Sequence, residues 1–194
     1  LAVLTLHHIV TDGWSTGILV REMGPLYEAY RHRRDAQAPA MLPSLPIQYA
    51  DYAAWQHEQL SGARLAEEIE YWSSALAGMP PVLELPTDRP RPAVQTVHGR
   101  THSFDVPTGV AAGLRKLARR EDATLFQVLL AAYQVLLYRY TGQNDLCVGT
   151  PIANRTRPEL EGLIGFFVNT LVIRARFGTE AHHDLTFREL LRQV

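Results

Sequence analysis

The residues best suited to chemistry lie near the start of the chain, in the segment His7-His8-Ile9-Val10-Thr11-Asp12-Gly13. Histidine is the usual general base near neutral pH, because its ring gains and loses a proton in that range. A carboxylate four residues after His8 can hold the turn by pairing with a base or by capping a helix. A glycine lets the backbone approach a substrate closely. Together these residues predict a site that takes a proton from a nucleophile, although each one alone is more often structural.

Metal binding is a competing interpretation of the histidines. The candidate ligands are His7, His8, Asp12, His182 and His183. Adjacent histidines on a strand point to opposite faces, so they rarely bind one ion together. The sequence has neither a His-Glu-x-x-His motif nor paired cysteines. It therefore predicts no metal site.

The elements around this turn can be predicted from apolar spacing. The run Leu1–Leu6 predicts a buried strand that leads into the turn. Apolar residues at helical spacing predict an amphipathic helix over about 15–34, with Ser15 as its cap. Residues 35–46 contain three prolines and are expected to form a loop. Further helices are expected at about 46–60, 63–77, 108–120 and 123–140, and a last one from about residue 186.

Prolines divide the chain in its middle. They are frequent between residues 79 and 96, and proline fixes φ and removes a backbone donor, so this stretch is expected to be irregular. Strands are expected at 101–106, 145–150 and 167–174. Helices and strands are mixed throughout, and this predicts an α/β architecture.

Composition narrows the class of protein. Of the 194 residues, 46% are hydrophobic and 20% are charged, which is typical of globular chains. The formal charge of -1 gives no indication of a nucleic-acid surface or an electrostatic membrane anchor, and no apolar run is long enough to span a bilayer. The single cysteine, Cys147, excludes an internal disulfide and is expected to be a small buried residue. A reducing, cytoplasmic location fits these features.

Both ends of the chain have the character of interior sequence. Residue 1 lies inside an apolar run, and residues 187–194 follow a helical pattern without a stop signal. The chain is therefore expected to be an internal fragment of a larger protein.

Five segments, in order along the chain, resemble the condensation domains of nonribosomal peptide synthetases. The first is His7–Gly13, which resembles their HHxxxDG motif and is followed by Trp14-Ser15 in the family manner. The second, Tyr49–Gln56, is similar to their YxDYAxWQ segment. The others are the lobe connection and two later family segments, found here at 71–92, 148–155 and 164–170. The family's opening elements and its later HQDxPFE segment are absent, so the isolated chain is expected to be inactive.

The resemblance implies a chloramphenicol-acetyltransferase-like sandwich of two lobes. Residues 1–80 would form the later part of the N-terminal lobe, 81–96 the proline-rich connection, and 97–194 a truncated C-terminal lobe. It further implies amide-bond formation between two thioesters, each carried on the phosphopantetheine arm of a carrier domain. The expected partners are an upstream donor carrier, a downstream acceptor carrier and an adenylation domain in the same polypeptide. No directly bound cofactor, nucleic acid or membrane is expected.

The same resemblance assigns roles to residues. His8 is the expected catalytic histidine, as a general base, as an orienter of the amine or as a stabiliser of charge. His7 is expected to pack behind the site, and Asp12 to form a structural ion pair, with Arg155 as the expected partner. Gly13 would bring its backbone N–H near the reacting carbonyl. The candidates for the tunnel wall are Trp14, Ser15 and Asn169.

Related activities remain as alternatives. Epimerisation domains share the HHxxxDG turn, but they usually place a small residue before Ser-Trp, whereas Trp14-Ser15 follows Gly13 here. Heterocyclisation relatives replace both histidines with aspartate, and standalone acyltransferases lack the pattern of Tyr49–Gln56. A catalytically inactive module that recruits other proteins is the third alternative. The intact histidines and Asp12-Gly13 argue against it.

Overall fold

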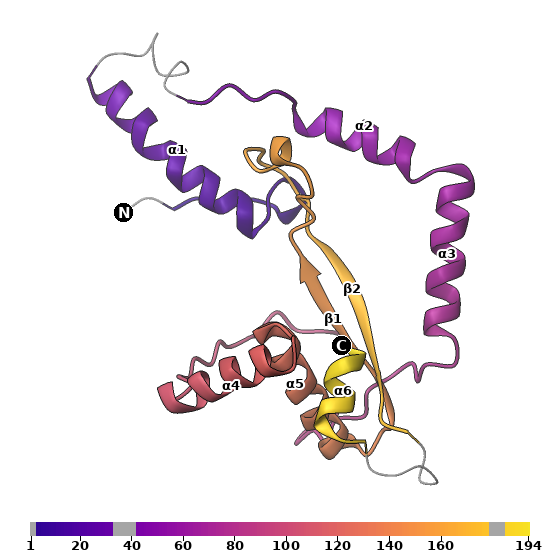
Figure 1. The fold of residues 1–194 in the computed structure, drawn as a ribbon. Helices are drawn as coiled ribbons and strands as arrows, with labels where there is room; N and C mark the ends of the chain where they lie inside the picture. Colours follow the sequence, from indigo (N-terminus) through magenta and orange to yellow (C-terminus); the bar gives the residue numbers. More distant parts are fainter. Residues whose placement is uncertain (1–2, 33–41, 179–184) are drawn as a thin grey trace. The chain divides into compact units, whose positions relative to one another are not determined.

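The computed structural model describes residues 3–32, 42–178 and 185–194 (Figure 1). Among the described residues, 3-10 turns include η1 (His8–Val10) and η4 (Pro158–Leu160). The strands β1 (Asp145–Ile152) and β2 (Asn169–Arg176) pair in a two-stranded sheet. The helices are α1 (Gly13–Arg31), α2 (Tyr49–Gln59), α3 (Gly62–Leu76), α4 (Thr108–Arg120), α5 (Leu125–Thr141) and α6 (Phe187–Gln193). This mixture confirms the α/β prediction.

The chain groups into two compact units. Unit 1 comprises Leu1–Ala75 and Thr150–Leu171, and unit 2 comprises Leu76–Gly149 and Val172–Val194. Residues 150–171 therefore pack with the first part of the chain, from which they are far away in sequence. The division into lobes at 1–80, 81–96 and 97–194 refers to the family's domain and stays a prediction.

Helix ends follow local capping signals. The helix expected from residue 15 begins at Gly13, because Asp12 is its N-cap and accepts a hydrogen bond from the Ser15 N–H. The predicted cap, Ser15, instead lies in the first turn and is buried. Helix α5 begins with a capping box of Thr124 and Gln127 and ends at Gly142, whose φ of 68° suits glycine. Residues 33 and 34, at the end of the first predicted helix, lie outside the described residues.

Two predicted strands are wrong. Residues 3–6 and 101–106 contain no regular structure, and Val3 and Phe104 are 82% and 76% exposed. An apolar or alternating segment becomes a strand only when a neighbour pairs with its backbone groups. Within the described residues, the sheet contains only β1 and β2. The strand expected from Phe167 begins at Asn169, because the Phe167 N–H donates to the side chain of Asp12.

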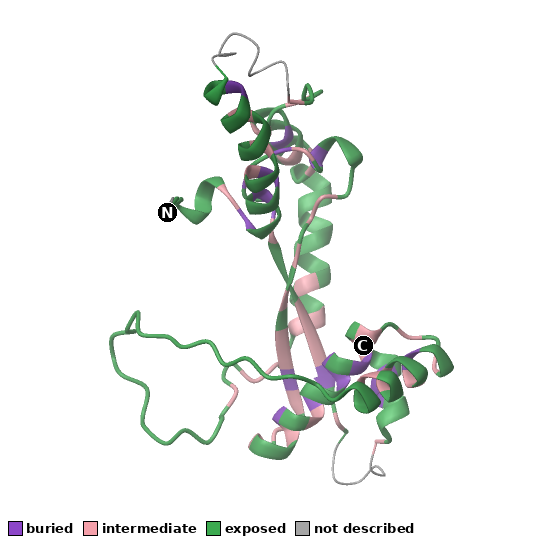
Figure 2. Ribbon diagram, turned by 90° about the vertical axis from the view of Figure 1, so that its left-hand side faces the viewer, coloured by how far each residue is buried: buried purple, intermediate pink, exposed green. Residues whose placement is uncertain are grey.

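Each unit has its own apolar cluster, and Figure 2 marks the buried residues. The cluster of unit 1 joins α2 to the segment after β1 through Tyr52, Leu160, Leu163 and Phe167. The cluster of unit 2 joins α4, α5 and α6 to the sheet through Ala118, Val128, Ala131, Leu137, Leu146, Ala175, Leu190 and Leu191. In the part of the chain that is described, no helix is both long and apolar enough to cross a membrane.

Candidate functional site

The histidine turn is held by its own backbone and by His7. The imidazole Nδ1 of His7 accepts a hydrogen bond from the Ile9 N–H at 3.0 Å and thereby caps η1. His8 is exposed, and its ring contacts the ring of Phe166 edge to face, with 5.1 Å between centroids and 74° between planes. His7 thus has a structural role in the turn, whereas the side chain of His8 is exposed.

Asp12 anchors the turn to the rest of unit 1. Its carboxylate is buried, and its Oδ1 accepts a hydrogen bond from the Ser15 N–H at 2.8 Å. Its Oδ2 accepts a hydrogen bond from the Phe167 N–H at 3.1 Å, and the Nη2 of Arg155 lies 3.4 Å from Oδ1. Burial alone raises the pKa of Asp12, but the hydrogen bonds from Ser15 and Phe167 and the charge of Arg155 hold it below its ordinary value. The carboxylate is therefore ionised and acts as an acceptor.

Arg155 is the cation of this buried pair, and its side chain is only 1% exposed. Its Nη1 donates to the carbonyl oxygens of Leu160 and Leu163, the second at 2.8 Å. The guanidinium carbon lies 4.0 Å from the centre of the Phe167 ring, which faces it. These contacts fix the planar group from both its edge and its face. Burial lowers the pKa of Arg155 and the charge of Asp12 opposes this effect.

Ser15 joins the turn to the segment that follows η4. Its hydroxyl oxygen is 2.8 Å from Oδ1 of Asp12 and 2.9 Å from the carbonyl oxygen of Gly165. Since a hydroxyl has one proton, it donates to one of these acceptors at a time. The same oxygen accepts hydrogen bonds from the Gly165 N–H at 3.1 Å and from the Nη2 of Arg155 at 3.0 Å. Ser15 is fully buried, so these contacts bind it firmly to both stretches of chain.

Residues 165–167 form the other wall of this network. Gly165 packs so closely on Tyr49 that an added Cβ would lie 2.2 Å from a ring carbon. The hydroxyl of Tyr49 donates to the carbonyl oxygen of Phe166 at 2.9 Å. Three consecutive residues are therefore tied to three side chains from the early part of the chain, namely those of Ser15, Tyr49 and Asp12.

The remaining predicted residues lie nearby or make local contacts. Gly13 is the first residue of α1 and is exposed. The indole N–H of Trp14 donates to the carbonyl oxygen of Glu161 at 2.9 Å. Asn169 begins β2, where its side-chain oxygen accepts a hydrogen bond from the Thr170 N–H at 2.8 Å. The metal candidates His182 and His183 lie outside the described residues.

The sequence did not predict Gly165, Phe166, Phe167 or Tyr49 as site residues. A glycine followed by two aromatic residues was the available signal, inside a segment already matched to the family. Their role depends on contacts with residues more than 100 positions away, and these are not visible in local spacing.

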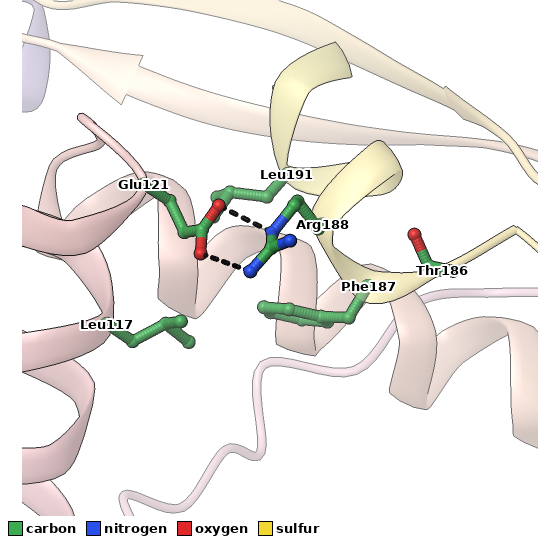
Figure 3. Close-up of a pocket in the computed structure, with 6 residues that line it drawn as sticks. All are labelled: Leu117, Glu121, Thr186, Phe187, Arg188 and Leu191. Carbon is green, nitrogen blue, oxygen red and sulfur yellow. Dashed lines mark hydrogen bonds and ion pairs between the residues drawn. The ribbon is translucent and has the colours of Figure 1, made fainter.

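A separate hollow of about 310 Å³ lies in unit 2, between the end of α4 and the start of α6 (Figure 3). The Nε of Arg188 is 2.7 Å from a carboxylate oxygen of Glu121, and its Nη2 is 2.9 Å from the other. The lining residues are Leu117, Glu121, Thr186, Phe187, Arg188 and Leu191. None of the predicted catalytic residues is among them.

Comparison with known proteins decides the family. The family model described as "Condensation domain" matches residues 1–194, which is the whole chain. The chain belongs to the condensation domain family. Among curated relatives, one of the subunits of linear gramicidin synthase from Brevibacillus parabrevis is 52% identical over 192 residues, which are 99% of this chain and 4% of the relative. Phosphinothricin tripeptide synthetase PhsB of Streptomyces viridochromogenes is 52% identical over 99% of this chain and 15% of its own length. This condensation-domain chain thus spans a small share of the synthetases that it matches.

Solved structures share the fold of this condensation-domain chain. The X-domain from teicoplanin biosynthesis has a TM-score of 0.83 and 30% identity, over 97% of this chain and 41% of that one. The four-domain nonribosomal peptide synthetase AB3403, solved with AMP and glycine, has a TM-score of 0.74 and 32% identity, over 97% of this chain and 13% of that one. The recognition of the family from the HHxxxDG turn and four further segments is confirmed.

Proposed function

We propose that this condensation-domain chain contributes the catalytic turn of an amide-forming enzyme. The reaction joins two aminoacyl or peptidyl thioesters held on the phosphopantetheine arms of donor and acceptor carrier domains. The observation that supports it best is an exposed histidine, His8, at the start of a turn whose aspartate is buried, ionised and held by hydrogen bonds and an ion pair. Asp12 is a poor proton acceptor in that state, so His8 is the base that the turn offers.

The chemistry is a nucleophilic acyl substitution. The nitrogen of the acceptor amine attacks the carbonyl carbon of the donor thioester, and a tetrahedral oxyanion forms. His8 takes the proton that the nitrogen loses and returns it to the leaving thiolate as the carbon–sulfur bond breaks. Gly13 lies at the amino end of α1, where the first N–H groups of a helix have no partner within the helix. Its N–H is suited to stabilise the oxyanion.

We assign the other residues of the turn to support. His7 caps η1, and Asp12 and Arg155 hold the turn against the segment after β1. Ser15 was a candidate for the tunnel wall, but its complete burial suits it better to bracing the turn. Trp14 and Asn169 remain candidates for the wall, because Trp14 is 47% exposed and Asn169 is also exposed.

The relatives support a proposal for the partners and the setting. These include a gramicidin synthase and a tripeptide synthetase, and AB3403 has four domains and was solved with AMP and glycine. We therefore propose donor and acceptor carrier domains as partners, and an adenylation domain in the same polypeptide. The lobes at 1–80 and 97–194, joined by 81–96, belong to this proposal.

A recruiting module is the second candidate function. The teicoplanin X-domain, which has been solved in complex with OxyB, has a TM-score of 0.83 to this chain. This similarity supports a surface that binds another protein as the alternative role.

In the deciding experiment, this sequence replaces the matching segment of the linear gramicidin synthase relative, to which it aligns over 192 residues. The chimera is mixed with donor and acceptor carriers that bear aminoacyl groups, and the acceptor is analysed by mass spectrometry in deuterated water. The proposal predicts an amide on the acceptor. Deuterium at the α-carbon without an amide would instead indicate epimerisation. A folded chimera that yields neither product would favour the recruiting module.

A further inference from the structure

The side chain of Phe166 contacts the ring of the proposed catalytic histidine, His8. The two rings meet edge to face, at 5.1 Å between centroids and 74° between planes. Aromatic rings prefer this arrangement, because the positive edge of one ring faces the negative face of the other. The contact therefore favours particular orientations of the imidazole.

The backbone on both sides of Phe166 is fixed. Gly165 bonds through both its N–H and its carbonyl group to the hydroxyl of Ser15. The carbonyl oxygen of Phe166 accepts a hydrogen bond from Tyr49, and the N–H of Phe167 donates to Asp12. The ring of Phe166 is thus carried by a rigid backbone, whereas His8 lies in a 3-10 turn of three residues.

We propose that Phe166 is a positioning residue that holds the His8 imidazole in its reactive orientation. This inference rests on the proposed function, since it concerns the same histidine. Asp12, Ser15 and Tyr49 act on His8 through the backbone of residues 165–167 and through the Phe166 ring. The buried ion pair and the exposed base are in this way parts of one connected structure.

The contact with His8 gives a reason for an exposed apolar side chain at position 166. Phe166 is 41% exposed, so it contributes less to the core than its buried neighbour Phe167, which is 2% exposed. Replacing it should therefore cost little stability. An exposed base needs its ring held against rotation, because misplacement of a reacting group lowers the rate steeply.

The test combines a spectroscopic and a kinetic measurement on Phe166→Leu and the more conservative Phe166→Tyr. The full chain is labelled with ¹³C-histidine, and the His8 ring signals are assigned by their loss in His8→Ala. The matched control is Phe126→Leu, because Phe126 is likewise a partly exposed phenylalanine, on α5. Thermal unfolding of every variant reports whether the fold is kept.

We expect Phe166→Leu to shift the His8 ring signals, while Phe166→Tyr and Phe126→Leu leave them near their original positions. In the chimera, Phe166→Leu should lower kcat about tenfold with little change in KM. The conservative variant Phe166→Tyr should keep kcat near the wild-type value. Unchanged His8 signals in a folded Phe166→Leu chain would overturn the inference. The spectra are recorded without substrate turnover. An inactive chimera would therefore count against the proposed function, whereas the His8 ring signals would still test the role of Phe166.

Discussion

The carboxylate of Asp12 accepts hydrogen bonds from residues that lie at widely separated places in the sequence. Ser15 is three residues away, whereas Arg155 and Phe167 are 143 and 155 residues away. A buried charge costs several kcal/mol unless a counter-charge and hydrogen bonds compensate for it. Arg155 and two backbone N–H groups supply that compensation. At the residue scale, the ion pair of Asp12 and Arg155 therefore holds the turn in place.

Removing the charge of Asp12 tests this view. Asp12→Asn keeps a side chain that can cap α1 but leaves the Arg155 guanidinium buried without its counter-charge. The free energy of unfolding should fall by about 3 kcal/mol, measured by urea denaturation. The control Asp88→Asn changes an exposed aspartate and should shift it by less than about 0.5 kcal/mol. Equal stability of the two variants would contradict the structural role of the pair.

The pH dependence of stability follows from the same carboxyl. The folded-state pKa of Asp12 lies below its ordinary value, since its hydrogen bonds and Arg155 outweigh burial. Its contribution to stability is complete above about pH 4 and is lost as the pH falls through the lowered folded-state value. The difference in unfolding free energy between the wild type and Asp12→Asn should therefore shrink over the acidic range below about pH 4. A difference that stays constant over this range would show that Asp12 does not titrate with a lowered pKa.

The partner of Asp12 could be expected only from the resemblance to a family, because no local spacing connects positions 143 residues apart. The buried position of Ser15 was not predicted for the same reason. A serine directly after a turn is normally a cap, and here Asp12 takes that role. The residue types in the turn predicted which residues belong to the site. The role of each residue, however, depends on its tertiary contacts.

At the element scale, residues 165–167 connect the turn to α2. Gly165 is required there, because an added Cβ would lie 2.2 Å from a ring carbon of Tyr49. Gly165→Ala should lower the free energy of unfolding by about 2 kcal/mol, since Tyr49 or the backbone must move. Urea denaturation measures this loss.

The chain offers a matched control for this substitution. Gly113 lies inside α4, and a Cβ added there meets no atom within 4 Å. Gly113→Ala should raise the free energy of unfolding by about 0.5 to 1 kcal/mol, because alanine favours helix. Equal effects of the two substitutions would contradict the close packing of Gly165 on Tyr49.

Helices were predicted better than strands, and the reason is physical. The period of 3.6 residues and the caps are local signals, so α4 begins at the expected residue and α5 within two residues of it. A strand depends on a partner whose position the local sequence does not contain. Val3 to Leu6 and Thr101 to Val106 carry strand-like patterns, but among the described residues only β1 and β2 are paired.

At the scale of the whole molecule, every contact described for the turn comes from unit 1. Unit 1 combines the first 75 residues with residues 150–171, so the turn is complete only when both stretches fold together. The chain covers 40% of the SgcC5 protein of Streptomyces globisporus, which has a TM-score of 0.73 to it. Activity is therefore best measured with the chain inside a complete relative.

The rate of amide formation by that chimera, with and without His8→Ala, tests the central claim most directly. The matched control is His57→Ala, which removes an exposed histidine from α2. If His8 transfers the proton, its replacement should lower kcat by about 100-fold or more, while His57→Ala leaves kcat unchanged. A folded His8→Ala chimera that forms the amide at the wild-type rate would contradict the account.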